Sequence, residues 1–345
     1  MITIPSTFRS AARHLVDPHF RIHENQIEAY GTCSTILKCR LEAAHPDTGF
    51  FKLKKWPSMD PRSLTIRDGI LRYTDKGFSQ TTGTEESNCT PFGATFADPG
   101  TVTPDLARAL TDLIPCMSKD ETRYVLRGIY CAERLVATDG RRLLLFESPY
   151  KGPPFIMPDA AANMLSIMHG KSPSTFWRWQ AAYATQPDET SEGYLRTIRI
   201  TTTAISLEFR IIEGNYPNYK QVIPNHEGAT LGVRCYPQED AIASMAAWLR
   251  TRDKVSLVPV QEGILCHDAT TGDHAAFPGY LSAPCHFNGK FLHDFLRVSG
   301  FHYFSSVDEE CPAVCHYHNG LGILMPMRGH VDTAAIQESH YLATA

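Results

Sequence analysis

The chain has 345 residues, of which 43% are hydrophobic and 20% are charged, and its formal net charge at pH 7 is −4. This length exceeds what one hydrophobic core usually fills, so two or three domains are expected. No apolar run is long enough to span a membrane, and the first residues lack the apolar region of a secretory signal, so we expect a cytoplasmic protein. The negative charge argues against a protein that holds nucleic acid by bulk electrostatic attraction, because such domains are usually basic.

The first hundred residues predict a meander of short antiparallel strands after one short helix. A helical segment is expected at residues 7–16, where Phe8, Ala11, Ala12 and Leu15 share one side. Strand-like runs separated by turn-forming residues follow at 20–22, 26–30, 34–41, 50–53, 63–66, 70–73 and 78–82. Residues 54–62 are too short and too interrupted by proline to form a second helix.

A helix is predicted to begin at Thr103 and Pro104, where threonine can cap the amino terminus and proline suits the first turn. Its apolar stripe consists of Leu106, Leu110, Leu113, Ile114 and Met117. Two apolar runs between residues 126 and 145 then flank the segment A-T-D-G-R-R, whose Asp-Gly pair favours chain reversal. From these residues alone, the element is a hairpin of the hydrophobic core.

The second half repeats an order of helix, strands, helix and strands. Helices are expected from about Pro158, over residues 238–249, and after Asn288 as an N-cap. Further strands are predicted at 174–179, 194–201, 204–212, 255–260 and 263–267. Residues 224–229 have the composition of a linker between domains.

Three segments, ATDGRRL (137–143), EGNYPNYKQVIP (213–224) and ILMPMR (323–328), together resemble the bacterial sliding clamp family, the beta subunit of DNA polymerase III. Their order and spacing match that family, and the resemblance spans residues 101–328. It implies an α+β DNA-clamp fold, in which repeated domains of antiparallel sheet carry helices on one face. The implied domains are a reduced first domain at 1–100, a second at 101–225, a third at 226–328, and a tail at 329–345.

The resemblance also implies a function without catalysis or cofactor. Clamps of this family are rings, here expected as a homodimer, that encircle double-stranded DNA and tether a polymerase as its processivity factor. A hydrophobic pocket between domains 2 and 3 receives peptides of the polymerase and the clamp loader. Carried over residue by residue, the pocket consists of Leu126, Thr138, Gly140, Arg141, Arg142, Leu143, Pro217, Val222, Ile323, Met325 and Arg328.

The helices of such clamps line the central hole, which implies a set of DNA-facing residues. These candidates are Arg108, Lys119, Arg123, Tyr124, Lys171, Arg250, Arg252, Lys290 and Arg297. The chain departs from the family where Asp159 and Ala160 replace a usual basic pair, and where the sequence continues beyond the MPMR segment.

Two other functions remain open on the sequence. The departures are compatible with a clamp-derived monomeric adaptor that binds clamp-binding peptides without encircling DNA. The group of cysteine and histidine residues at 311–318 raises the possibility of an enzyme or metal site. Its spacing lacks a pair of CxxC motifs and alternates across a strand, so no metal is expected and the cysteines are predicted to be thiols of the core.

Overall fold

In the computed structural model of the chain, the described residues are most continuous after residue 103. They are 104–171, 177–184, 194–201, 205–225, 230–261, 263–328 and 334–337. Before these, the structure describes 2–3, 6–13, 15, 19–23, 26–30, 36–40, 49–52, 63–67, 70–75, 78–83, 95–96 and 100–102. Residues 54–62, for which the sequence predicts no second helix, lie outside the described residues.

The chain divides into two compact units, and it passes from one to the other several times. Unit 1 consists of Met1–Ile114, Thr122–Leu135 and Ser148–Asn215. Unit 2 consists of Pro115–Glu121, Val136–Glu147 and Tyr216–Ala345. The division into three domains made from the sequence stays a prediction.

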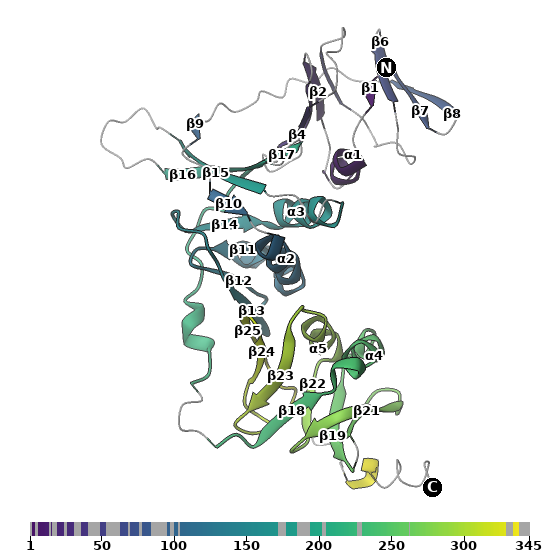
Figure 1. Ribbon diagram of the computed structural model, residues 1–345, viewed down its shortest axis with the longest axis vertical. Coiled ribbons are helices and arrows are strands. Elements are labelled where there is room, and N and C mark those ends of the chain that lie inside the picture. Colours follow the sequence, from purple (N-terminus) through teal and green to yellow (C-terminus); the bar gives the residue numbers. More distant parts are fainter. Residues whose placement is uncertain are drawn as a thin grey trace. The chain divides into compact units, whose positions relative to one another are not determined.

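Antiparallel strands dominate unit 1 (Figure 1). One sheet follows the order β1-β6-β7-β8, formed by Ile2–Thr3, Ser63–Arg67, Ile70–Asp75 and Phe78–Gly83. A larger sheet follows the order β10-β15-β16-β17-β4-β3-β2-β5, with β9 (Thr95–Phe96) paired to β15. Its strands are Gly100–Val102, Trp177–Ala184, Tyr194–Thr201, Ile205–Arg210, Ile36–Arg40, Gln26–Tyr30, His19–His23 and Gly49–Lys52. β11 (Gly128–Cys131) pairs with β14 (Phe155–Pro158).

Three helices pack together in unit 1, namely α1 (Ser6–Ala12), α2 (Pro104–Leu113) and α3 (Asp159–Lys171). The expected stripe of α2 is confirmed, because Leu106, Leu110 and Leu113 are buried. A short 3-10 turn, η2 (Ile114–Cys116), follows α2, so the α-helix ends before the predicted Ile114. A second 3-10 segment, η3 (Glu121–Arg127), precedes β11.

Unit 2 carries one long antiparallel sheet with the strand order β13-β25-β24-β23-β18-β21-β20-β19-β22. In that order the strands are Arg142–Glu147, Gly320–Leu324, Ala313–Tyr317, Phe301–Ser306, Val233–Pro237, His274–Leu281, Gly263–Asp268, Val255–Val260 and Cys285–Phe287. The chain crosses from unit 1 to unit 2 within β12 (Arg134–Thr138). β19 and β20 confirm the strands predicted at 255–260 and 263–267.

Two helices of unit 2, α4 (Glu239–Leu249) and α5 (Gly289–Leu296), lie against each other beside this sheet (Figure 1). Asn288 caps α5 as predicted, because its side chain accepts a hydrogen bond from the Phe291 amide at 3.1 Å. Leu292 and Phe295 are fully buried, so the side of α5 that carries them faces the core. Gly322 of β25 leaves room for Phe295, since an added Cβ would lie 2.9 Å from that ring.

Hydrogen bonds attach the chain after β25 to unit 2. The Met327 amide donates to the His286 carbonyl of β22 at 2.8 Å. A helical turn at residues 334–337 follows, and the Gln337 side-chain amide donates to the Pro259 carbonyl of β19 at 2.6 Å. Residues 334–337 therefore pack against β19 of the sheet.

The described cysteines are free thiols, and six of the seven are buried. Burial raises the pKa of Cys131, Cys266 and Cys315 above the ordinary thiol value. Within the described residues there is no cluster of three potential metal ligands. The same residues include no helix long and apolar enough to cross a membrane.

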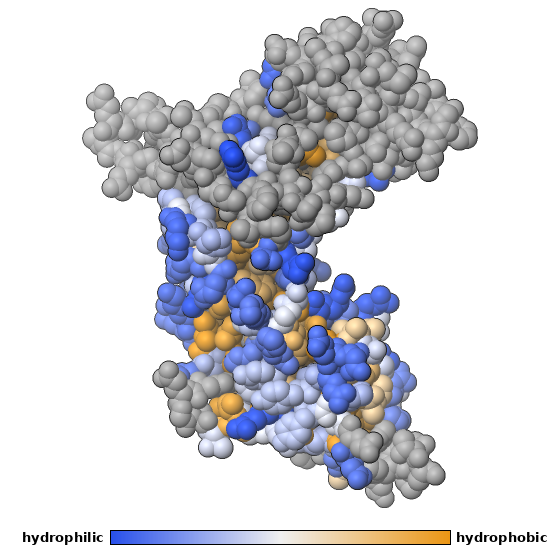
Figure 2. Space-filling model, in the orientation of Figure 1, coloured by the Kyte–Doolittle hydropathy of each residue, from blue (hydrophilic) through white to orange (hydrophobic). Residues whose placement is uncertain are grey.

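The surface mixes hydrophilic and apolar residues on the face shown in Figure 2. This mixture is ordinary, since more than half of a folded protein's accessible surface comes from apolar atoms. The exposed large hydrophobic side chains among the described residues are Tyr124, Val222, Tyr236, Tyr280 and Met325. Two of these, Val222 and Met325, belong to the implied peptide pocket.

Candidate peptide and DNA interfaces

The tip of the β12–β13 hairpin is a tight turn held by its own side chains. The Asp139 carboxylate accepts hydrogen bonds from the amides of Arg141 at 2.9 Å and Arg142 at 3.1 Å. The Thr138 hydroxyl donates to the Arg142 carbonyl at 2.7 Å and accepts from the Gly140 amide at 3.1 Å. Gly140 has φ +87°, a left-handed conformation that glycine adopts without a Cβ penalty. The turn predicted from Asp-Gly is therefore confirmed.

Arg142 ties this hairpin to α5. Its Nε donates to the Asp139 carboxylate at 3.0 Å, and its Nη1 donates to the Asp294 carboxylate at 2.6 Å. Its Nη2 donates to the Pro115 carbonyl, and the guanidinium carbon lies 4.2 Å from the centroid of the Phe291 ring. Only 8% of Arg142 is exposed. The guanidinium is thus occupied by contacts inside unit 2, which favours a positioning role over direct contact with a peptide.

Electrostatics keep this buried arginine charged. Burial alone would lower the pKa of Arg142, but Cys116, Asp294 and Asp139 act in the opposite direction and raise it above the ordinary value. A charged guanidinium with two carboxylates, a carbonyl and an aromatic face has its hydrogen-bonding capacity largely used. The hairpin tip and α5 are therefore held in fixed relation within unit 2.

β25 places the last implied pocket residues beside the hairpin. Leu143 pairs with Ile323, and Arg142 pairs with Leu324. The Met325 amide donates to the Arg141 carbonyl at 3.1 Å, which extends the pairing past the end of β25. Leu143 and Ile323 are each 2% exposed and belong to the core, whereas Met325 is 46% exposed. Of these residues, Met325 offers an accessible apolar side chain, and methionine adapts to differently shaped partners.

The segment before η4 (Tyr219–Val222) is attached to the same unit. The Tyr216 hydroxyl donates to the Val136 carbonyl of β12 at 3.4 Å. Tyr219 is buried, while Pro217 and Val222 are exposed, with Val222 55% exposed. Exposed Arg328 follows Met325 by three residues.

The remaining implied pocket residue, Leu126, is buried at the end of η3 and belongs to unit 1. The structure therefore assigns ten of the eleven implied residues to unit 2. Thr138 to Leu143 lie on one hairpin, Ile323 and Met325 lie beside it, and the segment at 216–222 is tied to β12.

The implied DNA-facing residues of unit 2 differ in whether their side chains form ion pairs within the unit. The Arg252 guanidinium lies 3.9 Å from the Trp248 ring, pairs with Asp268 at 3.6 Å and with Asp273 at 3.2 Å, and is committed to internal contacts. Lys290 pairs with Asp253 at 2.9 Å.

Arg250 and Arg297 are exposed caps at the carboxyl ends of α4 and α5. Within the described part of the chain, neither side chain has an ion pair or a hydrogen bond. Lys119, between η2 and η3, is also exposed. Arg250 and Arg297 are therefore the strongest candidates of this unit for an external anion.

In unit 1, Arg108 lies on the exposed side of α2. The pKa of His169 on α3 is lowered mainly by burial of the imidazole and, to a smaller extent, by the positive charge of Arg108. Arg123 and Tyr124 are exposed on η3, and Tyr124 is 56% exposed. Lys171 is the last residue of α3. Asp159, at the start of α3, pairs with Arg127 at 3.1 Å, so it neutralises a neighbouring arginine.

Sequence reasoning did not identify Asp294 and Phe291 as part of the hairpin's environment. They lie about 150 residues from Arg142 in the chain, since the Arg142–Asp294 bond has a separation of 152. The spacing of apolar residues along 289–296 predicts a helix, but nothing near these residues in the sequence predicts their contact with Arg142.

Comparisons with known proteins agree with this fold. No family model matches the chain. The chain is 25% identical over 180 residues to a protein named beta sliding clamp from Treponema pallidum, which covers 47% of this chain and 43% of that relative. The sequence match thus spans less than half of the relative's length.

Solved structures match over nearly the whole chain. The DNA polymerase III beta subunit from Thermotoga maritima gives a TM-score of 0.70 at 16% identity, covering 94% of this chain and 97% of that one. A DnaN sliding clamp from Bartonella birtlesii, bound to griselimycin, gives 0.70 at 16% identity, covering 95% and 99%. The clamp from C. crescentus gives 0.66 at 18% identity, covering 95% and 99%. The chain therefore has the DNA-clamp fold, and about half of its sequence is similar to part of a bacterial beta sliding clamp.

Proposed function

We propose that the protein is a DNA sliding clamp, a noncatalytic homodimeric ring in the cytoplasm that encircles duplex DNA and tethers a polymerase as its processivity factor. The observation that carries this proposal is the coverage of the structural match, since 94% of this chain aligns with 97% of a clamp subunit. A match of this extent spans nearly the whole subunit and not a single shared domain.

The charge of the chain suits a topological hold on DNA. A net charge of −4 cannot supply strong attraction, but an enclosing ring needs only a weakly positive inner surface. Exposed Arg250 and Arg297 at the ends of α4 and α5 provide such charges. Strong phosphate pairing would oppose sliding, so a few unpaired arginines fit the role.

The partner site proposed for the polymerase and clamp loader is the implied peptide pocket. Exposed Val222 and Met325 would take up leucine or phenylalanine anchors, each worth roughly 1.5 to 3 kcal/mol when fully buried. Two such anchors together contribute about 3 to 6 kcal/mol before the entropy of association is subtracted, which is less than the about 8.2 kcal/mol of a micromolar complex, so we expect weak binding. This affinity suits partners that must exchange.

Retention on DNA of different topology tests the ring. The protein is incubated with a nicked circular plasmid, separated from free protein by gel filtration, and the same complex is then linearised with a restriction enzyme. Loss of protein on linearisation supports encirclement. Equal retention on circular and linear DNA would contradict it.

Mass measurement in solution separates the ring from the monomeric adaptor considered from the sequence. A dimer at micromolar concentration supports the clamp. A strict monomer that still binds clamp-binding peptides would support the adaptor and overturn the proposed ring.

A further inference from the structure

Unit 2 contains a groove between α4 and α5 whose lining residues differ from those of the candidate peptide pocket. Its volume is about 760 Å³, within the range of about 300 to 1,000 Å³ found for ligand sites. Ile242, Leu296 and Phe301 line its apolar middle. Ala243 and Ala247, both exposed, keep the α4 side of the groove open because their side chains are small.

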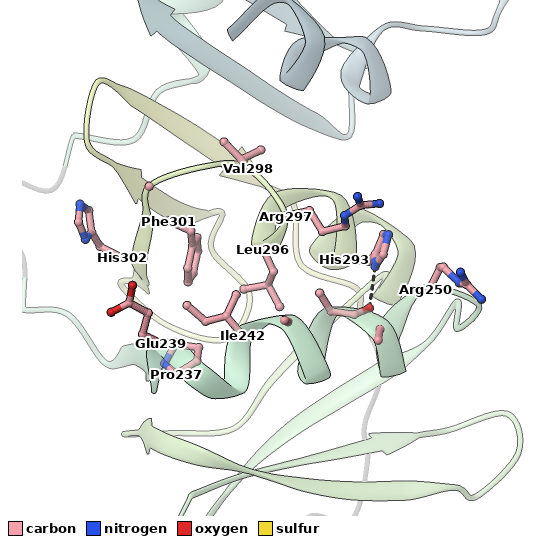
Figure 3. A pocket seen from close by; sticks show the side chains of 14 residues that line it. Pro237, Glu239, Ile242, Arg250, His293, Leu296, Arg297, Val298, Phe301 and His302 are labelled. Atoms are coloured by element: carbon pink, nitrogen blue, oxygen red, sulfur yellow. Dashed lines mark hydrogen bonds between the residues drawn. The ribbon is translucent and has the colours of Figure 1, made fainter. Parts of the chain in front are cut away.

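The two ends of the groove carry opposite charge, as Figure 3 shows. Arg250, Arg297 and His293 lie at one end, and Glu239 with His302 lies at the other. Among the described residues, no carboxylate pairs with the Arg250 or Arg297 side chain. These two charges therefore remain available to an anionic group of a ligand.

His293 is fixed in the wall at the basic end. Its Nδ1 lies 2.6 Å from the Ala246 carbonyl, so this nitrogen carries the hydrogen. His293 is only 8% exposed, and its ring closes the space between the two helices. The groove is thus a built feature of the helix pair, with defined ends.

The charge pattern selects the class of ligand. A nucleic acid strand carries negative charge along its whole length, so it would meet Glu239 unfavourably at the acidic end. A peptide with an acidic group at one end, a basic group at the other, and apolar side chains between them matches all three regions. Glu239 and Arg250 are 11 positions apart on α4, which is about 16 Å of helix and about five residues of extended peptide.

We propose that the α4–α5 groove is a docking site for a dipolar peptide segment of a partner protein. The acidic group of this segment pairs with Arg250 and Arg297, its basic group pairs with Glu239, and its apolar side chains cover Ile242, Leu296 and Phe301. The site is separate from Val222 and Met325 and does not depend on the proposed ring. Because Arg250 and Arg297 are also candidate DNA contacts, the peptide and duplex DNA compete for this face.

Selection from a phage library of random peptides of about twelve residues, long enough for a helix over the groove, tests the proposal. The immobilised full chain is the target, and an Ala247→Met variant, which fills the groove at an exposed helical position, is used for counter-selection. Peptides that survive are expected to carry Asp or Glu at one end, Lys or Arg at the other, and apolar residues between. Ser244→Met, at an exposed position of α4 outside the groove, should bind them like the wild type.

Charge reversal then tests the orientation of the selected peptides. Arg297→Glu should weaken a selected peptide about three- to tenfold, the effect of partly exposed ion pairs. Replacing the acidic residue of the peptide by lysine should restore binding to that variant. Arg234→Glu, an exposed change elsewhere in unit 2, should leave binding unchanged.

Three results would overturn the proposal. They are surviving peptides without charge polarity, equal binding to wild type and Ala247→Met, and binding of duplex DNA through Arg250 and Arg297 with no peptide enriched. The last result would assign this face to DNA alone. None of them depends on whether the protein forms a ring, which the plasmid experiment measures separately.

Discussion

Arg142 Nη1 lies 2.6 Å from the Asp294 carboxylate and joins the hairpin of β12 and β13 to α5. The hairpin carries Thr138, Gly140 and Arg141 of the candidate peptide pocket, whereas α5 ends in Arg297, a candidate DNA contact. The positions of two candidate interfaces within unit 2 therefore depend on one buried arginine.

Replacing Arg142 by methionine should lower the free energy of unfolding of unit 2 by about 3 kcal/mol, because removing one partner of a buried charged pair leaves the other uncompensated. Chemical denaturation, followed by fluorescence of Trp248 in this unit, measures the change. Arg141→Met is the matched control, since the neighbouring arginine is exposed and should change stability by less than about 0.5 kcal/mol.

A double-mutant cycle with Asp294→Asn isolates the pair. The combined loss in Arg142→Met with Asp294→Asn should be smaller than the sum of the single losses, because both remove the same contact. Additive losses would show that the two side chains do not stabilise the protein through each other.

Arg252 and Arg297 should respond differently to substitution by glutamine. Arg252 is held by Trp248, Asp268 and Asp273, so Arg252→Gln should lower stability and leave the salt dependence of DNA binding unchanged. Arg297→Gln should leave stability unchanged and reduce the slope of log K against log salt by about one, as expected for one phosphate contact. Thermal unfolding and fluorescence anisotropy with duplex DNA at several salt concentrations measure both. A smaller salt slope in Arg252→Gln without a loss of stability would contradict the internal role of Arg252.

Binding of a short peptide with leucine and phenylalanine anchors should depend on the exposed apolar residues of the candidate pocket. Val222→Ala and Met325→Ala should each weaken binding about tenfold, which corresponds to about 1.4 kcal/mol of lost apolar burial. Isothermal titration calorimetry gives the affinities. Tyr280→Ala removes a similarly exposed side chain from β21 and should have no effect. Equal losses for all three variants would place the peptide elsewhere.

Acidification should destabilise unit 2 through His267. Burial, and then the facing His274, lower the pKa of His267, whereas Asp268 acts in the opposite direction. The unfolded chain therefore binds more protons than the folded chain in the ordinary titration range of histidine, so stability is complete above that range and falls as pH is lowered through it.

Thermal midpoints measured from about pH 7.5 to about pH 5.5 should decline less steeply in His267→Gln than in the wild type, because this change removes a group whose pKa is lower in the folded chain than the ordinary value of about 6.5. His302→Gln, at an exposed position, is the control. An unchanged slope in His267→Gln would assign the acid sensitivity to other groups.

Local chemistry made several elements predictable from the sequence. The Asp139-Gly140 turn and the Asn288 cap are decided by neighbours within three residues, so both were correct. Of the strand predicted at 174–179, residues 177–179 are confirmed in β15 and 174–176 lie outside the described residues, whereas β15 continues to Ala184 because its pairing with β16 extends that far. The internal role of Arg142 could not be predicted, since Asp294 and Phe291 reach it only through the fold. The resemblance to the clamp family came from three separated segments, and the structural matches confirm the fold that it implies.

The contact of Gln337 with Pro259 has a consequence for how these molecules behave at high concentration. β22 pairs with β19 only from Val255 to Leu257, so the last residues of β19 extend past it. Proline offers no amide hydrogen there, and the glutamine occupies its carbonyl oxygen. A strand from a neighbouring molecule finds no donor at Pro259 and competes with Gln337 for its carbonyl oxygen, so this contact discourages intermolecular sheet growth at this position.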